Sequence, residues 1–161
     1  MKHARLLSLS FVVVVMLAGC AAPPPEQTVS TRNLYPNETP ELREKIVAAA
    51  RENDVPVSLV QRVVIRESTH RPEARNGPYY GLMQILPATA RSMGFQGQPS
   101  DLLDAETNLK YAVRYLRGAW LVSDGDEAEA VMWYARGYYY EAKRRGLLDE
   151  TGVHGRKDWP D

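Results

Sequence analysis

Glu67 is the side chain of this sequence best placed to do chemistry. It lies in the stretch VVIRESTHRP (63–72), in which an apolar helical run ends at a carboxylate and a proline prevents continuation. The negative end of a helix and partial burial both disfavour an ionised carboxylate, so both would raise the pKa of Glu67. A carboxyl group that keeps its proton near neutral pH can act as a general acid. The alternative, which this stretch alone favours, is a solvated surface glutamate at a helix end.

A second stretch, GPYYGLMQILPATA (77–90), contains the other candidate, Gln84. It joins a glycine-rich turn to a compact apolar run and then to a helix that starts with a proline. Gly81 allows the backbone to approach its surroundings closely. Gln84 is an amide inside the apolar run, where its donor and acceptor need partners. We therefore expect Gln84 to orient a ligand or the region of Glu67.

The rest of the chain predicts helices that would hold these residues in place. Apolar residues recur at helical spacing, and no segment alternates convincingly as a strand does. Helices are expected to begin near Thr39, Pro56, Pro87, Asp104, Glu127 and Tyr138. The last of them would end at Gly146. The sequence thus predicts an all-α domain with an irregular loop around 76–84.

Three segments resemble the soluble lytic transglycosylases, which are relatives of goose-type lysozyme. They are IRES (65–68), GLMQILPATA (81–90) and DAETNLKYAVRYL (104–116), and a weaker match is MWYARG (132–137). The resemblance spans about residues 45–145 and implies a compact lysozyme-like fold. It also implies that the substrate is peptidoglycan, cleaved between N-acetylmuramic acid and N-acetylglucosamine.

The resemblance gives roles to particular residues. It implies that Glu67 is the single catalytic acid and base. It implies a glycan cleft lined by Ser68, Asn76 in place of a serine, Gly81, Leu82, Met83, Gln84 and Tyr134. The chain departs from the family at Ala135, where an asparagine is usual, so local substrate contacts there are expected to differ.

The tyrosines near these segments have two interpretations. Tyr79, Tyr80 and Tyr138–Tyr140 offer apolar faces on which sugar rings can stack, or they pack between helices. We take Tyr80 and Tyr138 as candidates for substrate contact. His70 is expected at the surface or as a cap, because no partner is placed beside it. No histidine pair has the spacing of metal ligands, so the sequence predicts no metal and no cofactor.

The distribution of carboxylates favours a reaction in which the substrate supplies the nucleophile. Typical glycosidases use two carboxylates, yet no aspartate or glutamate lies between Ala74 and Ser100, with Glu73 and Asp101 at the edges of that gap. With Glu67 alone, the muramyl 6-hydroxyl would attack and close a 1,6-anhydro ring. Two alternatives remain, namely a hydrolytic lysozyme-like muramidase and a non-catalytic peptidoglycan-binding lipoprotein.

The first 20 residues predict export and a lipid anchor. MKHARLLSLSFVVVVMLAGC has a basic start, an apolar core too short to span a bilayer comfortably, and a small-residue end. It resembles a bacterial lipoprotein signal over residues 1–19, with Cys20, the single cysteine, as the lipidated N-terminus. A free buried thiol is the alternative. Ala21 stands where an aspartate would retain the protein in the inner membrane, which favours the periplasmic side of the outer membrane.

Composition and boundaries complete the expectations. The 161 residues, of which 44% are hydrophobic and 25% charged, suit one globular domain. The 20 basic and 20 acidic side chains create no net field that would attract nucleic acid. We expect a flexible proline-rich tether over 20–38, a catalytic domain over 39–148 and a loose tail over 149–161. A monomer is expected.

Overall fold

A computed structural model describes residues 33–153 of the chain. The predicted signal, Cys20 and most of the expected tether therefore lie outside the described residues. Within them the elements are, in order, α1 (Pro40–Glu52), α2 (Val57–Glu67), β1 (Arg75–Asn76), β2 (Tyr79–Tyr80), α3 (Pro87–Ser92), the 3₁₀ helix η1 (Pro99–Leu103), α4 (Ala105–Val122), α5 (Glu127–Arg136), α6 (Tyr139–Arg145) and α7 (Leu148–Thr151).

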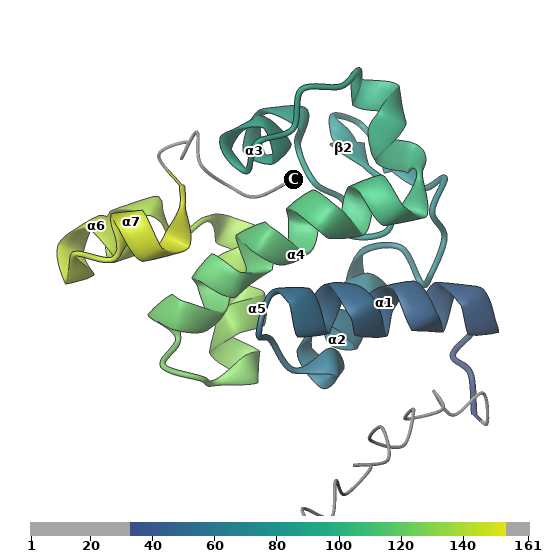
Figure 1. Ribbon diagram of the computed structural model, residues 1–161, viewed down its shortest axis with the longest axis horizontal. Helices are drawn as coiled ribbons and strands as arrows, with labels where there is room; N and C mark the ends of the chain where they lie inside the picture. Colours follow the sequence, from purple (N-terminus) through teal and green to yellow (C-terminus); the bar gives the residue numbers. More distant parts are fainter. Residues whose placement is uncertain (1–32, 154–161) are drawn as a thin grey trace, which may run out of the picture.

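The longest helix, α4, runs through the middle of the molecule (Figure 1). α1 and α2 lie on one side of it, α3 and the β hairpin lie on the other, and α6 and α7 pack near its C-terminal half (Figure 1). Its buried face carries Leu109, Ala112, Val113, Leu116 and Ala119, all at most 1% exposed. This periodic apolar face lets α4 contact α1, α3, α5, α6 and α7.

Local signals set where the helices begin. Thr39 caps α1 by accepting a hydrogen bond from the Leu42 N–H, and Asp104 caps α4 in the same way through the Thr107 N–H. Pro40 and Pro87 occupy the first turns of α1 and α3, where no backbone donor is needed. The all-α, lysozyme-like domain predicted from the sequence is confirmed.

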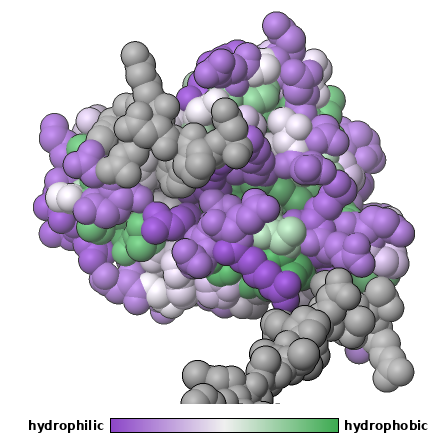
Figure 2. Space-filling model, in the orientation of Figure 1, coloured by the Kyte–Doolittle hydropathy of each residue, from purple (hydrophilic) through white to green (hydrophobic). Residues whose placement is uncertain are grey.

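One face of the molecule is mostly polar. Figure 2 shows hydrophilic residues over most of the face seen in Figure 1, with apolar residues in small patches between them. Among residues 33–153, no helix combines the length and the apolar character required to cross a bilayer.

The structure differs from the sequence expectation at both edges of the domain. The end of the expected tether is packed, because the Tyr35 ring stacks on His70 and the Glu38 carboxylate is fully buried against Arg43. The start of the expected loose tail forms α7, in which Thr151 is 1% exposed and its hydroxyl donates to the Leu147 carbonyl. The folded unit thus extends beyond 39–148 on both sides.

Candidate active site

A cavity of about 670 Å³ opens beside Glu67, the last residue of α2. Its wall is built from the end of α2, the β hairpin, the start of α3, the middle of α4 and the end of α5. A second cavity of about 390 Å³ shares Glu67, Asn76 and Gln84 with the first. Glu67 therefore lies where the two cavities meet, and a ligand in either would be within its reach.

Burial controls the protonation of Glu67. Its side chain is only 22% exposed, so the solvated surface glutamate does not describe it. Loss of hydration raises the pKa of the Glu67 carboxyl, and the Arg66 guanidinium, whose Nε lies 3.5 Å from Glu67 Oε1, opposes this rise in part. The net direction is upward, which favours a carboxyl group that retains its proton.

The end of α2 is held in an unusual backbone conformation. Thr69 and His70 are consecutive non-glycine residues in the left-handed region, with φ of 52° and 60°. Two side-chain hydrogen bonds fix this turn, from Asn37 Nδ2 to the Thr69 carbonyl at 2.9 Å and from Arg71 Nε to the Ser68 carbonyl at 2.9 Å. The turn stops the helix directly after Glu67.

His70 is buried, so the expectation of a surface or cap residue is wrong. Its Nε2 lies 2.7 Å from Gln61 Oε1, and Gln61 Nε2 donates in turn to Glu38 Oε1 at 2.7 Å. Burial would raise the pKa of Glu38, but hydrogen bonds from Arg43 and the Tyr35 backbone outweigh it and hold the pKa low. Burial lowers the pKa of His70, against the pull of the Glu38 charge. This network attaches the segment before α1 to the turn after Glu67.

Gln84 lies in the wall of both cavities and shapes the loop beside Glu67. Its Nε2 donates to the Ala74 carbonyl at 3.0 Å and to the Gly81 carbonyl at 2.9 Å. Both donors of the amide are thereby used inside the protein, which leaves the carbonyl oxygen as the group that can bind a ligand.

Asn108 on α4 locks the same loop from behind. Its Oδ1 accepts from the Met83 N–H at 3.0 Å, and its Nδ2 donates to the carbonyls of Tyr80 at 2.9 Å and Leu102 at 2.8 Å. Gly81 adopts φ of 73°, and a Cβ there would collide with the Asn108 side chain and the Leu102 carbonyl. The sequence analysis missed Asn108, although an amide on the apolar face of a predicted helix is a signal of a buried polar contact.

Tyr115 and Tyr134 form another part of the wall of the larger cavity. The Tyr134 hydroxyl donates to the Met83 carbonyl at 2.8 Å, and its ring meets that of Tyr115 edge to face with centroids 5.4 Å apart. Burial, aided by the Glu67 charge, raises the pKa of Tyr134 well above its usual value. Burial also raises the pKa of Tyr115 to about 12. Both phenols are therefore neutral donors at physiological pH.

The structure brings some of the predicted site residues to the cavities and keeps others away. Those in the cavity walls are Glu67, Asn76, Gln84 and Tyr134. Those outside both walls are Ser68, Tyr80, Gly81, Leu82, Met83 and Tyr138. Leu82 and Met83 are fully buried, and Ser68 is 2% exposed at the helix cap.

Tyr80 and Tyr138, the two candidates for substrate contact, are packed against other residues of the protein. The Tyr138 ring is 1% exposed and packs in the space that a side chain at Gly118 would fill, while its hydroxyl donates to the Tyr115 carbonyl. The Tyr80 ring is covered by the Arg75 guanidinium at 4.7 Å. Tyr79 instead lines the larger cavity and is 42% exposed, so it is the ring of this set available there.

The acidic residues near Glu67 are few. Among the described residues, Glu67 is the only carboxylate in the wall of the larger cavity, and Glu73 joins it in the smaller one. Asp101 lies elsewhere and accepts a hydrogen bond from the Gln98 N–H at the start of η1. Within residues 33–153 no group of three or more His, Cys, Asp or Glu side chains is arranged to hold a metal ion.

Comparison with protein families assigns this fold to a family. Residues 44–147 match the family described as Transglycosylase SLT domain. The chain belongs to this family. Comparisons with curated proteins and with solved structures found no match. The SLT domain covers α2 with Glu67, the loop over residues 76–84 (the cleft loop), α4 and α5, so the cavities lie inside the matched region. Members of the family are transglycosylases that act on peptidoglycan, and this chain is one of them.

Proposed function

We propose that this SLT domain cleaves the β-1,4 bond between N-acetylmuramic acid and N-acetylglucosamine without water, leaving 1,6-anhydromuramic ends. The observation that carries the proposal is that Glu67, half-buried and with a raised pKa, is the only carboxylate that residues 33–153 place in the wall of the larger cavity. A single carboxyl group supplies a proton and later takes one back, but it leaves no second carboxylate to activate water.

The reaction balances with Glu67 alone. Its carboxyl gives a proton to the glycosidic oxygen, and the bond from that oxygen to C1 of the muramic acid breaks with the electron pair on the oxygen. The muramyl 6-hydroxyl oxygen forms a new bond to C1, and its proton passes to the Glu67 carboxylate. The enzyme is regenerated in its protonated form, and no water enters.

Three residues of the larger cavity can assist the reaction, either beside Glu67 or by contact with the sugar. The neutral Tyr134 phenol is held by the Met83 carbonyl and lines the larger cavity together with Glu67. The Gln84 carbonyl oxygen can accept a hydrogen bond from a sugar hydroxyl or acetamido N–H, because its amide donors are occupied. Tyr79 offers an exposed ring face to a sugar.

Hydrolysis is the second candidate, and one observation favours it. Glu73 lies in the wall of the smaller cavity, which adjoins the larger one at Glu67. A carboxylate there would be available to activate water. A binding protein without turnover is the third candidate, since Ala135 lines the cavity where the family usually has an asparagine.

Mass spectrometry of the muropeptides released from purified cell wall tests the proposal. Wild type should release products with anhydro ends, lighter by about 18 mass units than reducing-end products because the elements of water are not added. Glu67→Gln should bind cell wall and release almost nothing. Glu73→Gln, the matched control, should give the wild-type products. Reducing-end products that vanish in Glu73→Gln would establish the hydrolase, and absence of release by wild type would establish the binding protein.

We also propose that the domain is held in the periplasm at the outer membrane by a lipid on Cys20. The support is the lipoprotein-like order of the first 20 residues. Cys20→Ser should abolish lipid attachment and stop processing of the signal, so that the unprocessed chain accumulates. Unchanged processing and membrane association in this variant would overturn the anchor.

A further inference from the structure

The cavities beside Glu67 carry an excess of positive charge that the rest of the chain does not share. Arg66 and Arg136 lie in the wall of the larger cavity, and Arg71 and Arg75 lie in the wall of the smaller one. Two carboxylates oppose these four guanidinium groups, and one of them is Glu67 itself. The whole chain has 20 basic and 20 acidic residues, and the cavity between α1 and α4 has equal numbers of each in its wall.

Each guanidinium is held by the protein. The Arg136 guanidinium lies 3.8 Å from the centroid of the Trp133 ring, and that of Arg75 lies 4.7 Å from the centroid of the Tyr80 ring. Arg71 donates through Nε to the Ser68 carbonyl, which leaves its terminal nitrogens available. A guanidinium that is already oriented loses less freedom when it binds a carboxylate.

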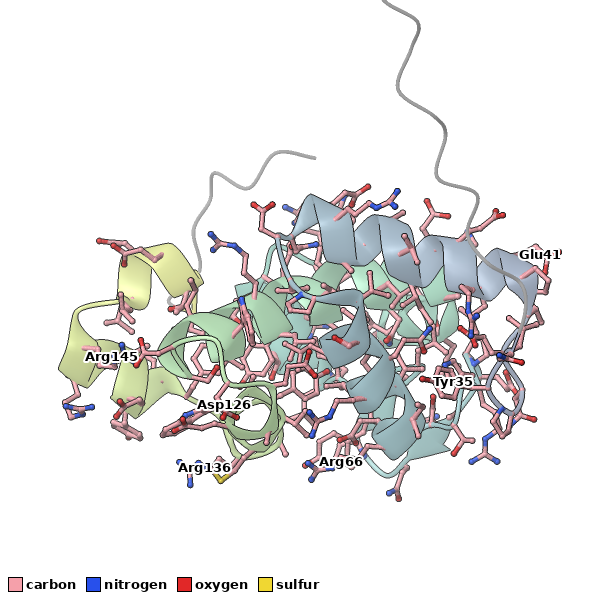
Figure 3. All side chains as sticks on the ribbon, turned by 90° about the horizontal axis from the view of Figure 1, so that it is seen from below. Tyr35, Glu41, Arg66, Asp126, Arg136 and Arg145 are labelled. Atoms are coloured by element: carbon pink, nitrogen blue, oxygen red, sulfur yellow. The ribbon has the colours of Figure 1, made fainter. Side chains whose placement is uncertain are left out.

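Arg66 and Arg136 lie along one edge of the molecule in Figure 3, on α2 and at the end of α5. Because both arginines line the larger cavity, a ligand in that cavity can be contacted by a guanidinium group from each of the two helices. Arg71 and Arg75 line the smaller cavity, which shares Glu67 with the larger one. A sugar ring at Glu67 thus has cationic side chains available in both cavities.

Peptidoglycan presents anionic groups at one type of sugar. N-acetylglucosamine is neutral, whereas N-acetylmuramic acid has a lactyl group that ends either in its own carboxylate or in a peptide with carboxylates. Planar guanidinium groups bind carboxylates through paired charge-assisted hydrogen bonds. The raised pKa of Glu67 favours the protonated carboxyl that catalysis needs. A protonated Glu67 carries no charge, so it does not repel a substrate carboxylate.

We propose that these arginines bind a carboxylate on the lactyl side of muramic acid, with Arg136 acting in the larger cavity and Arg75 in the smaller one. This inference rests on the proposed function for the glycan in the cleft. It adds that the enzyme selects muramic acid units by their negative charge, and that neutral glycan is a poor ligand.

Binding measurements with three glycan preparations test the inference, in a Glu67→Gln background that prevents turnover. The first preparation keeps its peptides, the second is stripped by an amidase so that the lactyl carboxylate is free, and the third is stripped and then converted to lactyl amides. At least one acidic preparation should bind about three- to tenfold tighter than the amide, in the range of charge-assisted contacts at a partly exposed site. This preference should shrink as salt is raised. The arm with the larger preference identifies the lactyl or the peptide carboxylate as the ligand.

Arginine variants decide whether the cavities are responsible. Arg136→Gln and Arg75→Gln should each reduce the preference for acidic glycan over amide, and the double variant should abolish it. Arg91→Gln is the matched control, because Arg91 is exposed on α3 and lies in neither wall. Arg66 is kept in every variant, because its guanidinium contacts the side chain at position 67 directly.

Two results would overturn the inference, namely equal binding of all three preparations or a preference that survives in the double arginine variant. Products of wild type acting on the same preparations keep this inference separate from the proposed function. Anhydro products without a preference for acidic glycan refute the inference alone. A preference without cleavage of any preparation refutes the proposed function alone.

Discussion

Replacing Asn108 by leucine should unfold the cleft loop before it unfolds the helices. Asn108 has no exposed surface and makes three hydrogen bonds, one from the Met83 N–H and two to the carbonyls of Tyr80 and Leu102. Leucine fills a similar volume but leaves the Met83 N–H and the Leu102 carbonyl without these partners, whereas the Tyr80 carbonyl still accepts from the Ile85 N–H at 3.1 Å. At about 1–2 kcal/mol for each of the two stranded groups, the loss of unfolding free energy should be about 2–4 kcal/mol. For a domain of this size that lowers the melting temperature by about 6–15 °C.

Asn53→Leu is the matched control for this prediction. Asn53 is also buried, but it makes one hydrogen bond, from Nδ2 to the Ala49 carbonyl at the end of α1. Its loss should cost about 1 kcal/mol and leave cell-wall cleavage unchanged. Calorimetry gives the melting temperatures, and the cleavage rate below the melting transition gives the activity of the folded protein.

The combination of the two readouts tests the reasoning. Asn108→Leu should lose cleavage activity even at temperatures where it is folded, because Gly81 and Gln84 belong to the loop that Asn108 fixes next to Glu67. A melting temperature equal to that of Asn53→Leu would show that the Met83 N–H and the Leu102 carbonyl find other partners. Full activity in folded Asn108→Leu would show that the loop needs no support from α4.

Substitutions of Glu67, His70 and Gln84 test the protonation of the site and the support of its loop. Glu67→Gln should raise the melting temperature at pH 7 and lose this advantage below about pH 4.5, and calorimetry at both pH values checks this. The reason is that a carboxyl whose pKa is raised in the folded state stabilises the fold only while it is protonated, so its contribution is lost as the pH rises. His70→Phe should flatten the fall of unfolding free energy between pH 7.5 and pH 5.5, as measured by urea titrations at both pH values. In the wild type, His70 of the unfolded chain takes up a proton near its ordinary pKa of 6.5, whereas the buried His70 of the folded state binds a proton only at lower pH. Gln84→Leu should reduce cleavage by more than its thermal stability explains, because its bonds to the Ala74 and Gly81 carbonyls shape the loop beside Glu67, and equal fractional losses of folded protein and of activity would contradict this.

The helices and Glu67 were predictable because their signals are local. Thr39 and Asp104 cap helices with bonds to residues three positions away, which the sequence shows directly. The partial burial of Glu67 follows from the apolar stripe of α2, which one further turn carries to the carboxylate. These features depend on neighbouring residues, so the chain order reveals them.

The contacts that the sequence did not predict join residues far apart in the chain. Asn108 binds Met83 across 25 positions, and the buried Gln61 and Glu38 are 23 positions apart. The segment before α1 folds back over the end of α2 and brings the Tyr35 ring and the Glu38 carboxylate beside His70. In the same way, Tyr80 and Tyr138 were candidates for sugar contact, and only the packing of the hairpin and of α6 turns their rings to other neighbours.

The position of Glu67 at a helix end makes sense when its arginine neighbours are considered together with the substrate. Burial raises the pKa of Glu67, and the charge of Arg66 limits the rise, so the free enzyme holds its catalytic proton less firmly than burial alone would allow. A substrate carboxylate bound by the arginines of the two cavities would neutralise part of this positive charge. The pKa of Glu67 would then rise further at the moment when the glycosidic oxygen needs a proton. The substrate that Glu67 must protonate would thus itself stabilise the protonated form of Glu67, because it neutralises the cations that favour the carboxylate.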